Sequence, residues 1–268
     1  MRIQHNIPAM NAYRNLSLNN SALNKNLEKL SSGYKINRAG DDAAGLAISE
    51  KMRSQITGLT MAKKNAKDGI SMVQTAEGAL TEVHDMLNRM VELATQAANG
   101  TYATEDCGYL NQEFDQLKKE ITRIGEKTRF NNQDIFTNSA VTLQIGEMKG
   151  DNLSFSVGAL SAGAIGVDAA SIGAATSAEA SIKMINDAIK KVSSTRATLG
   201  ATQNRLEHTI NNLGVVIENV QDAESTIRDT DIAEEMMAYT KNNILIQSAQ
   251  AMLAQANQVP QGVLQLLQ

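Results

Sequence analysis

Three histidines, one cysteine and two adjacent aspartates are the residues of this 268-residue chain whose chemistry would first suggest a reactive site. The histidines are His5, His84 and His208. They are scattered, and no His-x-x-x-His pair of the kind that binds a metal on a helix exists. The single Cys107 excludes an internal disulfide and a multi-cysteine metal site. No metal site is therefore expected.

Asp41 and Asp42 could be offered as paired carboxylates for acid–base catalysis. They lie in a Gly-flanked turn just before an expected helix, however, where aspartates usually cap the helix. The sequence also contains no Gly-x-Gly-x-x-Gly, no phosphate-binding loop and no His-Glu-x-x-His motif. The sequence therefore predicts a protein that is not an enzyme and that uses no cofactor.

Composition narrows the class of partner. Hydrophobic residues make up 42% of the chain, but aromatic residues only 3%, and there is no Trp. The formal net charge of -4 argues against nucleic acid as a partner, because phosphate binding needs clustered Lys and Arg. No apolar run reaches the ~18 residues that cross a bilayer, so no membrane insertion is expected. The N-terminal residues lack the apolar region of a secretory signal, so a cleaved signal peptide is not expected.

The elements that would position these residues are long helices. Apolar residues recur in alternating steps of four and three over residues 52–94, 110–124 and 182–227, which is the heptad period of helices packed along their length. The expected seam of the first helix is Met52, Ile56, Leu59, Lys63, Ala66, Ile70, Val73, Glu77, Leu80, His84, Leu87, Val91 and Ala94. That of the last is Ile182, Ile185, Ile189, Val192, Arg196, Leu199, Gln203, Leu206, Ile210, Leu213, Ile217, Val220, Glu224 and Ile227. Thr176 and Glu179 have the spacing of a capping box at its start.

Between the second and third seams the pattern changes to alternation. Apolar and polar residues alternate over residues 141–145 and 153–157, with Lys-Gly-Asp-Asn between them, which predicts a β-hairpin near 141–157. Residues 158–176 are rich in Gly, Ala and Ser and are expected to form a loop. The fold class is therefore mainly α, an elongated helical bundle or coiled coil with a small β-hairpin.

The two ends of the chain are unusually poor in charge. Residues 1–27 contain no acidic residue, and residues 242–268 contain no charged residue. Each end still carries apolar residues at helical spacing. In the N-terminal segment they are Leu16, Leu23, Leu27 and Leu30, and in the C-terminal segment Ile246, Leu253, Leu264 and Leu267. Such helices gain little from ion pairs and expose an apolar stripe, so each end should pack on the other or on copies of the same chain. Head-to-tail contacts that do not close into a ring build an open filament.

Three stretches resemble bacterial flagellin. They are LSSGYKINRAGDDAAGLAISEKM at 30–52, DGISMVQTAEGAL at 68–80 and QANQVPQGVLQLL at 255–267. The chain is similar to a minimal flagellin, because its middle has room only for the hairpin and a loop. The resemblance implies a subunit that polymerises into the bacterial flagellar filament for motility. It also implies an extracellular location, reached unfolded through the flagellar type III apparatus.

The resemblance implies four segments with paired N- and C-terminal helices. Residues 1–44 would form half of an inner coiled-coil domain with a spoke, which includes Gly40, Asp41 and Asp42. Residues 45–175 would begin a helical filament-packing domain that carries the hairpin. Residues 176–228 would supply the last helix of that domain, and residues 229–268 the other half of the inner domain. The expected polymerisation tail is Ile246, Leu253, Val263, Leu264 and Leu267.

The resemblance further implies partners. They are other copies of the chain, flagellar cap and hook-junction proteins, an export chaperone and the flagellin-sensing Toll-like receptor of animals. The residues expected to contact the receptor, or a neighbouring protofilament, are Leu87, Asn88, Arg89, Leu93 and Glu120. Asn88 and Val91 depart from the Gln and Arg usual in the family, which predicts weaker receptor binding.

Two other classes compete with a filament subunit. The first is a hook-filament junction protein, with related ends but few copies per flagellum. The intact stretch GDDAAGLAISEKM at 40–52 favours the filament subunit over it. The second is a generic coiled-coil adaptor, which would usually have charged ends rather than an uncharged tail.

Overall fold

The computed structural model describes the backbone of residues 6–266 and the side chains of residues 6–259. The chain divides into two compact units. Unit 1 combines Met1–Ile56 with Glu218–Gln268, and unit 2 is Thr57–Ile217. The long helices α2 (Ala43–Ala97) and α5 (Ala175–Arg228) contribute residues to both. No helix within residues 6–266 is long and apolar enough to cross a membrane.

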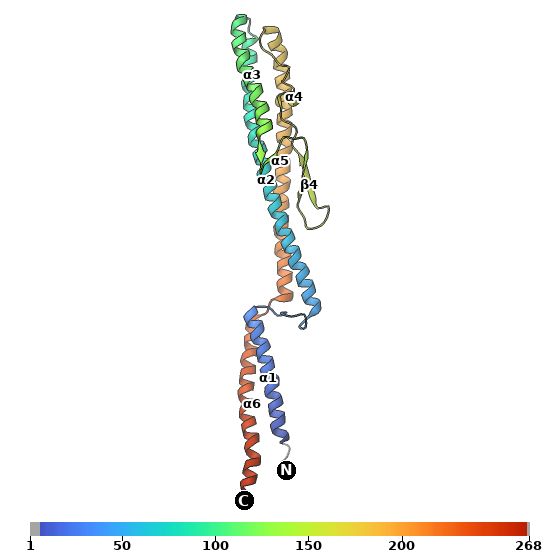
Figure 1. The fold of residues 1–268 in the computed structure, drawn as a ribbon, viewed down its shortest axis with the longest axis vertical. Coiled ribbons are helices and arrows are strands. Elements are labelled where there is room, and N and C mark those ends of the chain that lie inside the picture. Colours follow the sequence, from blue (N-terminus) through green and yellow to red (C-terminus); the bar gives the residue numbers. More distant parts are fainter. Residues whose placement is uncertain (1–5, 267–268) are drawn as a thin grey trace. The chain divides into compact units, whose positions relative to one another are not determined.

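Unit 1 is built on an antiparallel helix pair. Helix α1 (Ile7–Ser32) packs against α6 (Ile232–Leu266), as the sequence predicted for the terminal helices (Figure 1). The Asn6 side chain caps the start of α1, and Gly33 ends it with a φ of 75°, the left-handed conformation typical of a helix end. Asp231 caps α6 by accepting from the amides of Ala233 and Glu234, at 2.8 and 3.2 Å.

The seam between α1 and α6 is shallow and partly polar. Asn26 is the one residue of α1 that is buried. With its amide oriented to suit its neighbours, its Nδ2 donates to Glu235 at 2.9 Å and its Oδ1 accepts from Asn242 at 3.0 Å. Lys29 lies 3.6 Å from the same Glu235, and Asn6 donates to the Ala256 carbonyl at 2.8 Å. Polar contacts therefore contribute to the pairing of α1 with α6.

Unit 2 contains the hydrophobic core, formed by α2, α3 (Thr104–Lys127), α5, the hairpin and the segment that joins the hairpin to α5 (Figure 1). The predicted seams are half correct. On α2, Leu59, Ala66, Val73, Leu80, Leu87 and Ala94 are buried as expected. The alternate positions are displaced by one residue: Ala62, Ala76, Val83, Met90 and Ala97 are buried, whereas Lys63, Ile70, Glu77, His84 and Val91 are half-buried.

Helix α5 repeats this displacement. Its buried positions include Ile185, Val192, Leu199, Leu206 and Leu213, together with the small residues Ala178, Ser181, Ala188 and Thr202. The expected seam residues Ile189, Arg196 and Gln203 are only half-buried. Small residues at the closest positions let helix axes approach, so the larger aliphatic side chains pack beside the contact line instead.

The predicted hairpin is confirmed. Strand β3 (Ala140–Gln144) pairs antiparallel with β4 (Asn152–Ser156), with Val141 opposite Phe155 and Leu143 opposite Leu153. Leu143 occupies the space beside Gly69 of α2, where an added Cβ would lie 2.2 Å from its Cδ1. A second, unpredicted pair consists of β1 (Arg129–Phe130) and β2 (Gln133–Asp134), joined by Asn131 and Asn132 with φ of 48° and 62°.

The expected loop at 158–176 is wrong in two respects. It contains a short helix, α4 (Ala162–Ile165), and its apolar residues Leu160, Val167 and Ile172 belong to the core. We call residues 158–174 the strap. Helix α5 also begins at Ala175, which places Thr176 inside the helix rather than at a capping-box position. Gly, Ala and Ser suggested a loop, yet the apolar residues between them are buried, and Gly125 of α3 leaves room for the Leu160 carbonyl of the strap.

Candidate assembly interface

Apolar side chains of unit 1 are left uncovered. On α1 the exposed large hydrophobic residues are Ile7, Met10, Tyr13, Leu18 and Leu27. On α6 they are Ile232, Met236, Met237, Ile244, Leu245, Met252 and Val259. Leu245, Met252 and Val259 follow one another at intervals of seven, which places them on one face of α6. A soluble monomer rarely leaves such a run exposed unless another molecule covers it.

The expected polymerisation tail is only partly on this surface. Ile246 and Leu253 are half-buried. They share heptad spacing with Asn242 and Ala256, whose contacts with Asn26 and Asn6 place that face of α6 against α1. Both residues therefore belong to the seam within the chain, and Leu245 and Met252 beside them are the exposed ones.

The remaining tail residues lie further along. Val263 and Leu264 belong to α6, but their side chains are outside the described residues, as is the whole of Leu267.

The linker between α1 and α2 holds Gly40, Asp41 and Asp42, the expected spoke residues. Asp41 Oδ2 accepts from the amides of Asn37 and Arg38, at 3.3 and 3.0 Å. These hydrogen bonds to the charged carboxylate, the one from Arg38 foremost, lower the pKa of Asp41. Asp42 Oδ1 accepts from the amides of Ala44 and Gly45, at 3.1 and 3.0 Å, and so caps α2 as expected. Both carboxylates thus accept hydrogen bonds from backbone amides. This structural role explains the two aspartates without a catalytic one.

The expected receptor-contact residues divide by burial. Leu87 and Leu93 are only 0% and 1% exposed, so their side chains anchor α2 in the core of unit 2. Asn88 and Arg89 are exposed. Arg89 donates from Nε to Glu113 of α3 at 2.9 Å and from Nη1 to Glu92 at 2.8 Å. The hydrogen bond to Glu113, followed by that to Glu92, raises the pKa of the Arg89 guanidinium.

The structure brings Glu113, not Glu120, next to Arg89. Glu120 accepts a hydrogen bond from Arg123 at 2.8 Å, and this partner lowers the pKa of Glu120. The two glutamates are seven residues apart, about 10 Å along a helix, and share one face of α3. Sequence spacing therefore could not distinguish them, because the register between α2 and α3 decides which one faces Arg89. The exposed patch consists of Asn88, Arg89, Glu92 and Glu113.

The other chemically active residues form no second site. No group of three or more His, Cys, Asp or Glu among the described residues could hold a metal ion. Cys107 is 4% exposed, and its thiol lies 3.9 Å from the Ala97 carbonyl. It fills space between the end of α2 and the start of α3.

Comparison with known proteins settles the family. The model of the bacterial flagellin N-terminal helical region matches residues 3–141, and that of the C-terminal helical region matches residues 182–267. This chain belongs to the bacterial flagellin family. Flagellin of Halalkalibacterium halodurans is 54% identical and that of Bacillus subtilis 50%, each over the full length of both chains. The crystal structure of Bacillus cereus flagellin is 33% identical, with a TM-score of 0.51 over 56% of this chain and 88% of that one.

Membership decides the class of function. Flagellins are structural proteins that associate with their own kind into the bacterial flagellar filament, so this flagellin is a filament subunit and not an enzyme. A hook-associated protein of Vibrio parahaemolyticus has a TM-score of 0.60 over 70% of this chain and 100% of that one. It is only 13% identical, so the likeness shows a shared fold alone.

Proposed function

We propose that this flagellin polymerises through the uncovered apolar faces of α1 and α6. The observation that carries the proposal is the exposure of Met237, Leu245 and Met252 on a helix with no charge after Lys241. Burying such side chains removes apolar area from water, which contributes about 25 cal/mol per Å². Repeated contacts of this kind, each joining one copy to the next, build an open helical polymer.

Paired substitutions on α6 test this proposal. Met237→Glu and Met252→Glu place a charge on the uncovered face, at residues that are 68% and 65% exposed. Gln250→Glu adds the same charge at an exposed polar position of the same helix and serves as the control. We expect sedimentable filaments from the wild type and the control but not from the two Met variants. Normal filaments from both Met variants would rule out this face.

We propose further that the chain is exported unfolded by the flagellar type III apparatus, aided by an export chaperone, and adds at the tip under cap proteins. The family resemblance supports this route. Unit 1 fits it, because two helices with little buried area cost little to keep unfolded. The cost of ordering them is then offset by contacts in the polymer.

A role as ligand of the flagellin-sensing Toll-like receptor is supported by the exposed patch around Arg89. Arg often anchors interfaces because its planar fork makes several hydrogen bonds, and truncating such an anchor often costs about 2 kcal/mol, roughly thirtyfold in affinity. Here Arg89 must leave Glu92 or Glu113 to meet a partner. Titration of monomeric wild type and Arg89→Ala against the receptor ectodomain tests the role. Equal affinities would remove Arg89 from the contact.

The competing proposal is a hook-filament junction protein. Electron microscopy of the purified chain separates the two, because a filament subunit forms long polymers by itself and a junction protein does not. The full-length similarity to flagellins supports the filament subunit.

A further inference from the structure

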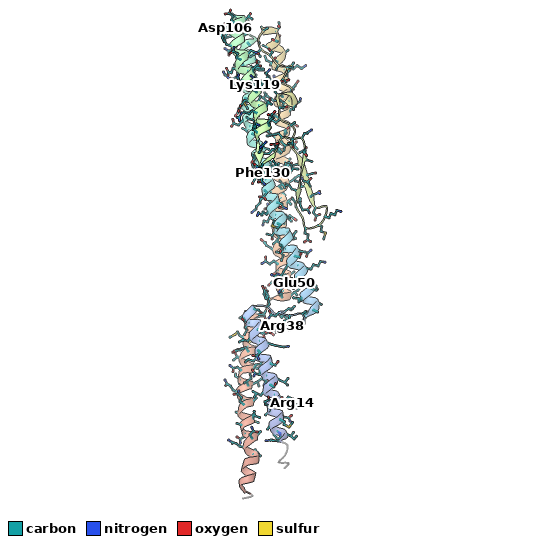
Figure 2. The ribbon with its side chains drawn as sticks, in the orientation of Figure 1. Arg14, Arg38, Glu50, Asp106, Lys119 and Phe130 are labelled. Carbon is teal, nitrogen blue, oxygen red and sulfur yellow. The ribbon has the colours of Figure 1, made fainter. Side chains whose placement is uncertain are left out.

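The helix pair of unit 1 carries methionine side chains that solvent can reach. Among its described side chains, the exposed methionines are Met10 on α1 and Met236, Met237 and Met252 on α6, and we call them the unit 1 methionines. Met10 shares a face of α1 with Arg14, an exposed residue four positions on that Figure 2 labels. Met237 and Met252 point within about 60° of each other, since each residue of an α-helix advances by about 100°. Their sulfurs thus lie on the uncovered apolar faces.

Unit 2 holds the same side chain in two other settings. Met72 and Met90 of α2 are buried and belong to the hydrophobic core. Met61 of α2 and Met148 in the turn of the hairpin are exposed, but they lie in unit 2. The chain therefore contains methionines that differ in exposure and in the unit to which they belong, which provides internal controls for any chemistry of the thioether.

The chemistry open to an exposed thioether is oxidation by hydrogen peroxide. A sulfur lone pair attacks one peroxide oxygen, the O–O bond breaks as the S–O bond forms, and the second oxygen leaves as water after proton transfer. Sulfur loses two electrons, and peroxide gains them. The product is methionine sulfoxide, whose polar group disrupts apolar interfaces. A buried sulfur reacts only when the structure opens, so Met72 and Met90 should react slowly.

We propose that the unit 1 methionines are an oxidation site that controls assembly. Sulfoxides formed on a free subunit oppose association, because burying such a polar group between copies without a hydrogen-bond partner is unfavourable. Packing between copies covers the same sulfurs, so a subunit in a filament is protected. The site does not require α1 and α6 to be ordered in the free subunit, since unfolding leaves these sulfurs exposed. The inference rests on the proposed polymerisation through the uncovered faces of α1 and α6.

Peroxide treatment of the full-length monomer tests the site. Peptide mass spectrometry should find sulfoxide at the unit 1 methionines while Met72 and Met90 remain unoxidised. The critical concentration for polymerisation, measured by sedimentation, should then rise by about tenfold or more. Methionine sulfoxide reductases specific for the two sulfoxide epimers should return it to the untreated value. Sulfoxide at all the unit 1 methionines with an unchanged critical concentration would overturn the inference.

Leucine substitutions assign the effect to particular residues. Leu keeps a similar apolar volume and forms no sulfoxide. The quadruple variant Met10→Leu/Met236→Leu/Met237→Leu/Met252→Leu should therefore assemble like the untreated wild type after peroxide.

The matched control is Met61→Leu/Met148→Leu, which removes two exposed sulfurs from unit 2. This control should remain as sensitive to peroxide as the wild type. A quadruple variant as sensitive as the wild type, or a resistant control, would overturn the assignment to unit 1. The treated wild type and its recovery with the reductases decide the question independently of both variants.

Treatment of assembled filaments tests the protection. Met237 and Met252 should gain sulfoxide at least about tenfold more slowly in the filament than in the monomer, because neighbouring copies cover them. Equal rates would overturn this part of the inference. Failure of the proposed function is distinct, because Met237→Glu and Met252→Glu would then polymerise normally. If the two Glu variants fail to assemble and the sulfoxide-bearing wild type assembles, the oxidation site alone is wrong.

Discussion

Units 1 and 2 are both helical, yet they bury their apolar residues very differently. In unit 2, α2, α3, α5 and the strap enclose a continuous core with fully buried side chains such as Phe114, Leu80 and Ile185. In unit 1, Ile36 is the one buried apolar residue among those whose side chains the structure describes. Along α1 and α6, large hydrophobic side chains point to solvent instead.

This difference distinguishes the properties of the monomer from those of the assembled filament. A core such as that of unit 2 can stabilise a fold in the monomer, because it removes enough apolar area from water to offset the ordering of the chain. A pair of helices with one shallow seam cannot do so to the same degree. We therefore expect substitutions in unit 2 to change the stability of the monomer, and those in unit 1 to change assembly.

The largest expected effect is at Gly125 of α3. A Cβ added there would lie 1.5 Å from the carbonyl oxygen of Leu160 in the strap, so backbone would have to move. We expect Gly125→Ala to lower the free energy of unfolding of the monomer by about 3 kcal/mol or more. Gly78→Ala is the control, since nothing lies within 4 Å of its added Cβ and helix propensity favours Ala by about 1 kcal/mol. Urea denaturation followed by circular dichroism measures both, and equal stabilities would contradict the packing of the strap.

A matched pair of leucines tests the comparison directly. Leu87 of unit 2 is 0% exposed and Leu18 of unit 1 is 62% exposed. Leu87→Ala should reduce the free energy of unfolding by about 2–5 kcal/mol, because it leaves a cavity. Leu18→Ala should change that free energy by less than about 0.5 kcal/mol and instead raise the critical concentration for assembly. If Leu18→Ala destabilises the monomer as much as Leu87→Ala, unit 1 has a core of its own.

Deleting residues 242–268 should abolish filaments without unfolding unit 2. The deletion removes most of α6, including the exposed Ile244, Leu245 and Met252, but no residue of unit 2. We expect a soluble, largely helical monomer whose main thermal transition matches that of the full chain. Ultracentrifugation and circular dichroism check these points. Filaments of the truncated protein that still pellet would contradict this prediction.

The smallest expected effect is the titration of Asp41 in the linker. Backbone hydrogen bonds from Arg38 and Asn37 lower its pKa below the ordinary 3.8. A depressed folded pKa means that Asp41 favours the ordered linker above the unfolded value, and that this contribution is lost as the pH falls through the folded pKa. NMR titration of the Asn37 and Arg38 amide shifts should show a midpoint below 3.8 that is absent in Asp41→Asn. A midpoint at or above 3.8 would mean that the two hydrogen bonds do not persist in solution.

Most of the architecture follows from local pattern. Alternation over residues 141–157 predicted the hairpin, and Asp42 was predicted to cap α2. The charge-poor ends predicted that each end packs on the other or on copies of the chain, and the resemblance to flagellin implied the pairing of the terminal helices. These features depend on neighbours within a few residues or on periodicity, which the sequence carries by itself. The strap shows where this fails, because its many Gly, Ala and Ser residues give it the composition of a loop, whereas the burial of Leu160, Val167 and Ile172 depends on segments that are distant in the sequence.

The sequence by itself determined that the chain is helical, which residues repeat by heptads and that its ends need a partner. Only the tertiary structure decided which way each helix is rotated. Hydrophobicity favoured Ile70 and Ile189 for the seams, but Gly69 and Ala188 are the buried ones. At Gly69 the reason is Leu143 of the hairpin, which occupies the space that a side chain would need. The same rotation and register turned Ile246 and Leu253 toward α1 and set Glu113, rather than Glu120, against Arg89. A seven-residue period determines which residues share a face of one helix. Which face is turned toward the core depends on the helix that packs against it.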